Sequence, residues 1–300
     1  MTDILMAAPS APAKPERKKK RGLGWLLAVP AALVTAVFGL YPLFVLIYTS
    51  FGLGELGPYE SESFEARGPL NGYIRALVIN DSVREAIKNS LIVAGGAVVI
   101  TVALAIPLVL YLARQARAGK QTGGIDVLMT FPIVLPGIII GFFMIVLFGR
   151  NGLLVGAIPG TRGLAFTMVG LMIAYVYFSI PRVVGPLRGA AEMLDPDLQD
   201  TAYSLGASRT RVFFTVTLPL ILPAAIEVAG TAAAVALGGY GTVAALSEGV
   251  RLLPLDVVDT LNNGYHIATA SAYAVILALL TVLCLAVGNV LSKLVRRAFA

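Results

Sequence analysis

Residue types that support chemistry are few and scattered in this chain. It contains one histidine, His266, and one cysteine, Cys284, which are too few for a cluster of such metal ligands or for a disulfide within the chain. The sequence also lacks the GxxxxGK[ST], GxSxG and HExxH patterns of phosphate-binding loops, hydrolases and metalloproteases. We therefore predict no catalytic residue and no metal site, and expect the chain to act by binding.

Glu227 and Tyr240 are the two isolated residues that are candidates for a functional role. Glu227 is the one acidic residue deep in a long apolar run. A carboxylate in hydrocarbon costs about 2.5 to 3.5 kcal/mol, so we expect it either to line a polar pathway or to be protonated or bonded to a hydroxyl such as that of Thr231. Tyr240 lies in the Gly-Gly-Tyr-Gly stretch 238–241, which is either a gate or a plain loop. Both residues are candidates for lining a pathway.

The composition predicts an all-α, polytopic membrane protein. Hydrophobic residues make up 57% of the chain and charged residues 13%, whereas soluble domains carry about 25% charged residues. Runs long enough to cross a bilayer as helices occupy residues 23–49, 90–113, 125–148, 164–184, 212–237 and 268–291. We predict about six spans. We expect residues 52–89 to form an external loop that ends in a short interfacial helix over 83–88.

The basic residues indicate how these spans are oriented. The net charge is +6, but Lys and Arg gather at the ends of apolar runs rather than in a stripe, which argues against nucleic-acid binding. With the N-terminus inside, sixteen of the 23 basic residues fall on the inner side, as the positive-inside rule requires. We predict that both termini are cytoplasmic, that residues 1–22 form a disordered basic tail, and that residues 23–300 form the membrane domain.

A polar segment, residues 195–219, separates the fourth and fifth apolar runs. Asp195 can cap the free amides of a helix, Pro196 suits the first helical position, and Asp197 complements the positive helix end. Ser208 can cap a second helix that continues into the next span. The segment therefore predicts two helices joined by a turn.

The first of these helices has one apolar face. Leu198, Ala202 and Leu205 fall at positions i, i+4 and i+7. Gly206 follows, and glycine tolerates the left-handed conformation that ends helices. We expect either a helix that a partner grips or an ordinary amphipathic helix on the membrane surface.

Residues 200–219 of this segment read DTAYSLGASRTRVFFTVTLP. This stretch resembles the cytoplasmic coupling loop of the permease subunits of binding-protein-dependent ATP-binding-cassette (ABC) importers, whose pattern is Glu-Ala-Ala, three residues, Gly, nine residues, then Ile-x-Leu-Pro. The matching positions are Asp200, Thr201, Ala202, Gly206, Val216, Leu218 and Pro219. The spacing is complete, although Asp, Thr and Val replace the family's Glu, Ala and Ile.

The resemblance implies a role for the loop and a set of partners. It implies that the helix is a cytoplasmic coupling helix held in a groove of an ATP-binding subunit. The implied contacts are Asp200, Thr201, Ala202, Leu205, Gly206 and Ala207. It further implies a second, non-identical permease subunit, two cytoplasmic ATP-binding subunits and an external or periplasmic solute-binding protein, at the bacterial inner membrane. No cofactor is expected in this chain, since ATP and magnesium would bind the partner ATPase.

Three other stretches carry the same resemblance, residues 131–137, 148–152 and 238–258. They resemble the branch of the family that transports polyamines, iron, phosphonates and tetrahedral oxyanions, so we expect a small polar solute. The alternative is a secondary transporter driven by an ion gradient. Such a carrier should show internal repeats and several ionisable residues within its spans, and only Glu227 stands out here.

Overall fold

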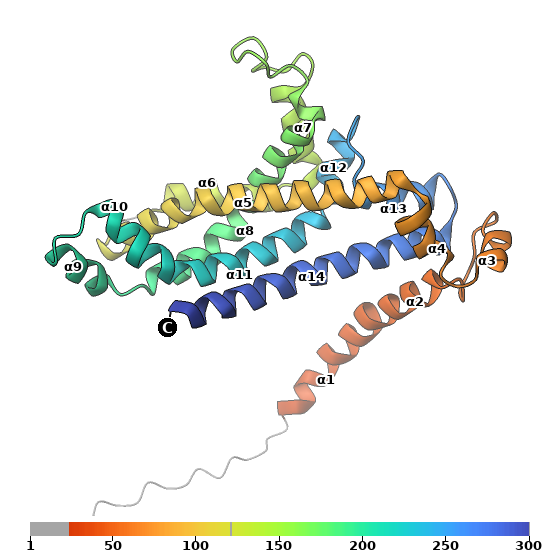
Figure 1. Ribbon diagram of the computed structural model, residues 1–300, viewed down its shortest axis with the longest axis horizontal. Coiled ribbons are helices and arrows are strands. Elements are labelled where there is room, and N and C mark those ends of the chain that lie inside the picture. The colour runs from red at the N-terminus through yellow and green to blue at the C-terminus, as the bar shows by residue number, and fades with distance from the viewer. Residues whose placement is uncertain (1–23, 121, 300) are drawn as a thin grey trace, which may run out of the picture. The chain divides into compact units, whose positions relative to one another are not determined.

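The computed structural model describes residues 24–120 and 122–299, and within these ranges the secondary structure is entirely helical (Figure 1). The tail predicted for residues 1–22 lies outside the described residues. By its internal contacts the chain divides into two compact units, Met1–Val45 and Leu46–Ala300. Within the described ranges, five helices are long and apolar enough to cross a membrane, or six if one bent pair counts as a span. The all-α polytopic fold is confirmed.

The first predicted span, 23–49, corresponds to a run of consecutive helices. α1 (Gly24–Thr35) passes through a π-helical turn (Ala36–Leu40) into α2 (Tyr41–Ser50). Its apolar stretch Val29–Ser50 has the length and composition of a transmembrane helix. The boundary between the two compact units falls within α2.

Four long helices dominate the second unit (Figure 1). They are α5 (Asp81–Arg117), α8 (Met168–Glu192), α11 (Leu218–Leu237) and α14 (Ile267–Phe299). α5 packs along α8, and α11 packs along α14. A Cβ atom at Gly230 would lie 2.9 Å from the Cα atom of Gly288, so α11 and α14 approach closely because neither has a side chain there.

The core of this unit follows α5, α8 and α11. Leu112, Leu187 and Ile221, one from each helix, are completely buried in a single apolar cluster. A second cluster joins α8 to α7 (Gly137–Phe148) and α12 (Tyr240–Leu246), and it includes Leu171 and Tyr175 of α8. These contacts fix the long helices against one another without any strand.

The third predicted span, 125–148, is broken into two helices. α6 (Gly123–Val134) and α7 (Gly137–Phe148) meet at an angle of 106°. Leu135 between them is extended, with φ −82° and ψ 126°, as a residue before proline prefers, and Pro136 has no amide with which to continue the helix. α6 and α7 together have the length and apolarity of one membrane span, but neither helix has them alone.

α7 packs against α12 (Tyr240–Leu246), a short helix that follows a second break in the chain. The α11–α12 break is at Gly238 and Gly239, where the hydroxyl of Tyr175 donates a hydrogen bond to the Gly239 carbonyl at 3.1 Å. A Cβ at Gly137 would meet the Thr242 amide nitrogen at 3.1 Å. The two helix breaks therefore lie beside each other.

Two other predicted boundaries need correction. The interfacial helix expected over 83–88 is the beginning of α5, because Asn80 caps that helix by accepting a hydrogen bond from the Ser82 amide at 3.1 Å. The fourth span, predicted as 164–184, begins later and ends later. A 3-10 turn (Leu164–Phe166) precedes α8, and the Thr167 side chain caps α8.

The loop expected over 52–89 contains short helices before α5 begins. These are α3 (Ser61–Arg67), α4 (Asn71–Ile74) and a π-helical turn (Arg75–Ile79). A further short helix, α13 (Leu253–Asn262), lies between α12 and α14 and contacts both α5 and α14. These short helices lie at one end of the bundle, called here the α13 end (Figure 1).

Candidate functional site

The polar segment 195–219, called here the Asp195 loop, folds at its start as its residue types dictate. α9 (Pro196–Ser204) begins with Pro196 at the first helical position. The Asp195 carboxylate accepts a hydrogen bond from the Asp197 amide at 2.9 Å, which satisfies one of the free amides of the first turn. The predicted helix start is confirmed.

Gly206 ends α9 in the left-handed conformation, with φ +84°. Its amide donates to the Tyr203 carbonyl at 2.9 Å, and the Ala207 amide donates to the Ala202 carbonyl at 3.1 Å. A Cβ at Gly206 would meet no atom within 4 Å. Glycine is therefore required by the backbone conformation and not by lack of space.

The second half of the loop leads directly into a candidate span. Ser208 caps α10 (Arg209–Val212) by accepting from the Arg211 amide at 3.3 Å. α10 continues through a π-helical turn (Phe213–Thr217) into α11. The whole stretch Arg209–Leu237 has the length and apolarity of a span, so a movement of α9 would act on α11 through a single short turn.

The predicted contact residues lie together on the surface of this loop. α9 has no buried residue. Asp200, Thr201, Leu205 and Gly206 are exposed, while Ala202 and Ala207 are half-buried. Leu205 is 84% exposed and stands just beyond the last residue of α9. The apolar face is present but nothing in the described chain covers it.

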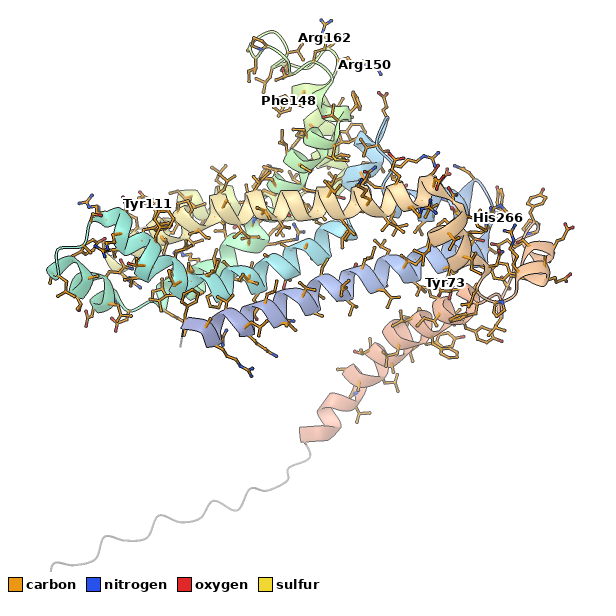
Figure 2. All side chains as sticks on the ribbon, viewed as in Figure 1. Tyr73, Tyr111, Phe148, Arg150, Arg162 and His266 are labelled. Carbon is orange, nitrogen blue, oxygen red and sulfur yellow. The ribbon has the colours of Figure 1, made fainter. Side chains whose placement is uncertain are left out.

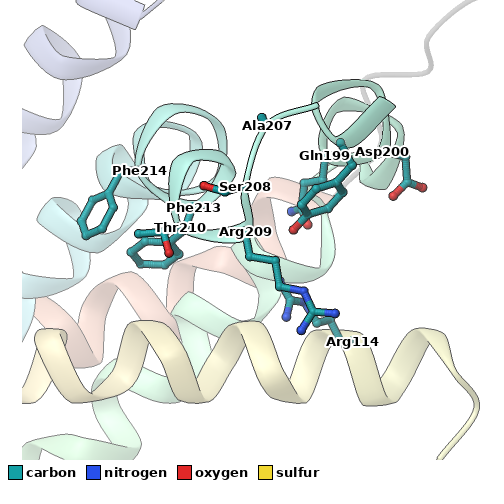
Figure 3. Close-up of a pocket in the computed structure, with 10 residues that line it drawn as sticks. Arg114, Gln199, Asp200, Ala207, Ser208, Arg209, Thr210, Phe213 and Phe214 are labelled. Carbon is teal, nitrogen blue, oxygen red and sulfur yellow. The ribbon is translucent and has the colours of Figure 1, made fainter. Parts of the chain in front are cut away.

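An open hollow of about 1080 Å³ lies between α9, α10 and the end of α5 (Figure 3). Its lining residues are Arg114, Gln199, Asp200, Tyr203, Ala207, Ser208, Arg209, Thr210, Phe213 and Phe214. Figure 3 shows the side chains of Arg114 and Arg209 extending toward the same part of the hollow, whereas the carboxylate of Asp200 points away. Two guanidinium groups so placed favour an acidic group in the hollow. The sequence alone did not suggest Arg114, because it lies on α5, far from the loop in the chain.

Glu227 lies on α11 and is paired with a residue near the end of α14. Its carboxylate Oε2 is 4.0 Å from Nη2 of Arg296, and the two side chains are 54% and 68% exposed. The hydroxyl of Thr231 donates to the backbone carbonyl of Glu227 at 3.3 Å and not to its carboxylate. The structure thus gives Glu227 a cationic partner that the sequence analysis did not name.

Tyr240 lies at the beginning of α12, at the edge of a second hollow of about 410 Å³. Arg251, Asp256 and Asp259 also line this hollow, and Glu227 does not. Burial raises the pKa of Asp256 to about 6; Arg251 opposes this increase and Asp259 adds to it. The structure therefore places the two predicted pathway residues in different surroundings.

A buried carboxylate, Glu60, holds the start of α14. Its side chain is completely inaccessible to solvent. It accepts hydrogen bonds from the amides of Gly57 (2.9 Å), Ala268 (2.9 Å) and Thr269 (2.8 Å). Burial raises the pKa of Glu60, but the hydrogen bonds from Thr269, Gly57 and Ala268 outweigh burial and hold it below its usual value.

His266 lies immediately before the first residue of α14 (Figure 2). Its Nδ1 atom is 4.0 Å from Oε1 of Glu60. No group of three or more His, Cys, Asp or Glu side chains arranged to hold a metal ion occurs in the described part of the chain. We therefore assign His266 to the contact with the Glu60 carboxylate and not to a metal site.

The candidate membrane spans, two of which are joined by a capped polar loop, define a polytopic membrane protein. Residues 103–299 match the family of binding-protein-dependent transport system inner membrane components, and because this match covers well over half of the chain, the chain belongs to that family. It is a type I ABC importer permease. It is a transport subunit and not an enzyme, since ATP is hydrolysed by a partner ATPase in this family.

Several curated relatives are molybdenum permeases. The chain is 34% identical over 188 residues to the molybdenum transport system permease protein ModB of Mycobacterium tuberculosis, which covers 61% of this chain and 70% of that protein. It is 32% identical over 207 residues to ModB of Haemophilus influenzae, covering 66% of this chain and 90% of that protein. ModB of Escherichia coli K12 is 34% identical over 167 residues, covering 55% and 72% respectively.

The fold is also shared with a solved transporter. A chain of the bacterial alginate ABC transporter, crystallised in complex with an alginate pentasaccharide-bound periplasmic protein, has a TM-score of 0.68 to this chain. The similarity covers 90% of this chain and 94% of that chain, at 15% sequence identity. At that identity the likeness concerns the fold alone.

Proposed function

We propose that this chain forms half of the translocation pathway of an ATP-driven importer for a tetrahedral oxyanion of the molybdate class. The observation that carries the proposal is the set of molybdenum permease relatives, one of which is matched over 90% of its length. Of the solutes that the sequence motifs left open, these relatives favour the oxyanion over polyamines, iron and phosphonates.

Glu227 is the acidic residue within a span that could attract a cationic substrate. Its carboxylate lies 4.0 Å from the Arg296 guanidinium, and both side chains are more than half exposed, so their attraction is weak. Glu227 therefore does not outweigh the molybdenum permease relatives, which favour an anionic substrate.

The Asp195 loop is the proposed docking site for the ATP-binding subunit. Its helix is capped at both ends and has no buried residue, and Leu205 is 84% exposed. The hollow beside it presents Arg114 and Arg209, which fit an acidic side chain of a partner. The excess of Lys and Arg on this side of the spans favours a cytoplasmic location for the loop and both termini.

The proposed complex contains a second permease subunit, two cytoplasmic ATP-binding subunits that hold ATP and magnesium, and an external solute-binding protein. ATP binding would close the ATP-binding subunits and move the two coupling helices together, and the loaded binding protein would favour the same outward-open state. ATP and the loaded binding protein each shift the equilibrium between the inward-open and outward-open states only as far as their preference for one of these states allows.

Purification from the native membrane in mild detergent tests this proposal. Mass spectrometry should identify an ATPase with a phosphate-binding loop and a second permease, and will show whether that permease is identical or not. In proteoliposomes, the binding protein loaded with molybdate should stimulate ATP hydrolysis, while the same protein mixed with putrescine should not. Recovery of the chain alone, with uptake driven by an ion gradient, would overturn the proposal in favour of a secondary transporter.

A further inference from the structure

The last turn of α5 holds the residues from which the Asp195 loop emerges. Nη2 of Arg117 donates hydrogen bonds to the carbonyl oxygens of Ala191 and Glu192, each at 3.2 Å, and to that of Leu194. These carbonyls are at the end of α8, where helical backbone has no internal partners. A cation there also complements the negative end of the helix. Arg117 thus fixes the incoming end of the loop to α5.

The same turn of α5 also reaches the outgoing end of the loop. Arg114 lines the hollow beside α9 together with Arg209 and Phe213, which lead into α11. Figure 3 shows the side chains of Arg114 and Arg209 extending toward the same part of the hollow. The end of α5 is therefore bonded to the incoming end of the Asp195 loop and shares a hollow with its outgoing end.

The other end of α5 holds α13 in a similar way. The Ser90 hydroxyl oxygen accepts a hydrogen bond from the Leu253 amide at 2.9 Å, at the first residue of α13. Nδ2 of Asn89 donates to the Arg251 carbonyl at 3.2 Å. Ser90 is buried. These contacts fix the segment that lines the hollow beside Tyr240.

α5 as a whole is one helix of 37 residues that contains both attachments and has Pro107 in its interior, and it runs along the bundle from α13 to α10 (Figure 1). At about 1.5 Å per residue, Ser90 and Arg117 are roughly 40 Å apart along its axis. Val93, Ala97, Val109 and Leu112 of α5 are completely buried. Pro107 has no amide to donate within the helix, so the close packing of this face against α8, and not the backbone alone, holds α5 together as one element.

We propose that α5 mechanically couples the Asp195 loop to the α13 segment at the opposite end of the bundle, with Arg117 and Ser90 as positioning residues at its two attachments. The inference rests on the proposed function, in which the Asp195 loop receives the ATP-driven movement. It adds that the movement reaches the far end through α5 as well as through α11. A measured interaction between the two attachments tests this coupling.

A double-mutant cycle in the reconstituted complex supplies that measurement. Arg117→Ala and Ser90→Ala should each lower the stimulation of ATP hydrolysis by the molybdate-loaded binding protein by about threefold or more. Because both variants break one route, the double variant should be no worse than the more damaging single one. Effects that multiply would overturn the inference. Arg117→Lys, which keeps a donor for the carbonyls, should recover part of the loss.

Ser271→Ala is the matched control. Its hydroxyl donates to the Ile267 carbonyl of its own helix at 2.8 Å, so its removal breaks no attachment of α5. Its effect should multiply with that of Arg117→Ala, since independent sites act additively in free energy.

Hydrogen exchange on the purified Arg117→Ala chain gives a second test that needs no ATP. The inference predicts faster exchange of the α13 amides as well as of residues 191–208. Exchange that rises only over 191–208 would overturn it. If the wild-type complex instead shows no stimulation by any loaded binding protein, the proposed function fails, and exchange still decides whether α5 links the two ends.

Discussion

The two ends of the helical bundle differ in how their polar groups are satisfied. At the α13 end, Glu60 is fully buried and accepts three backbone hydrogen bonds from its own chain. At the other end, α9 has no buried residue and Leu205 is 84% exposed. The Glu60 carboxylate is satisfied within the subunit, whereas α9 at the other end is shaped and capped but left uncovered. The difference indicates that α9 offers a surface for a partner to cover.

The largest expected effect is at Gly206, at the uncovered end. Gly206→Val places a β-branched residue at φ +84°, where side chains other than glycine cost about 1–2 kcal/mol or more. The chain should still fold and insert, but α9 should lose its orientation, and substrate uptake should fall at least about tenfold.

Gly206→Asn is the matched control for that variant. Asparagine tolerates the left-handed conformation, and open space surrounds the position. We expect uptake by Gly206→Asn to remain within about threefold of wild type. Equal losses in the two variants would show that the backbone conformation is not what matters.

The next largest effect is expected at Glu60, at the α13 end. Glu60→Ala leaves three buried amides without their acceptor and should lower the free energy of unfolding by about 3 kcal/mol. Glu60→Gln keeps one carbonyl oxygen and should cost less. The midpoint of thermal unfolding in detergent measures both. An unchanged midpoint in Glu60→Ala would contradict the assigned role.

Glu60 should also give the stability a pH dependence with a definite sign. Because its folded pKa lies below the usual 4.5, its stabilisation is fully present above pH 4.5. It is lost as the pH falls through the lower, folded pKa. The Glu60→Ala variant should therefore differ most from wild type near neutral pH and converge with it in acid.

Asp256 should show the opposite dependence, with a smaller effect. Its pKa is raised from 3.8 to about 6, so the folded state binds more protons between these values and stability should fall as the pH rises from about 4 to 6. Asp256→Asn should remove this slope. Asp259→Asn should shift the slope to lower pH, because Asp259 contributes to the raised pKa. A slope that persists in Asp256→Asn would assign it to another group.

The smallest expected effect concerns the ion pair that Arg150, in the loop after α7 (Figure 2), forms with Glu248. The atoms are 3.1 Å apart, but the side chains are 77% and 57% exposed. Exposed pairs contribute about 0 to 1 kcal/mol. Glu248→Gln should therefore leave the unfolding midpoint almost unchanged, and a large decrease would mean that this pair is shielded in the complete protein.

The features that could be predicted from sequence are those set by neighbouring residues. Asp195, Gly206 and Ser208 each act within a few positions along the chain, so their roles in ending and starting helices followed from residue type. The break at Pro136 was also encoded locally by the proline, but the continuous apolar run around it did not reveal the size of the bend. Residue type gave the existence of the spans more reliably than their ends.

The features that escaped prediction depend on distant parts of the chain. Glu60 binds amides 208 and 209 residues later, and Arg117 binds carbonyls more than 70 residues later. In the sequence these residues resemble ordinary loop or helix-end charges. Only the fold brings them to the helix ends that they hold.

Hydrogen exchange with and without the co-purifying ATP-binding subunit tests the central claim most directly. If the ATP-binding subunit covers the Asp195 loop, the amides of α9 and residues 205–207 should become protected when that subunit binds. The amides of Ala268 and Thr269, already bonded to Glu60, should not change. Formation of the complex with no change in exchange over α9 would contradict the account.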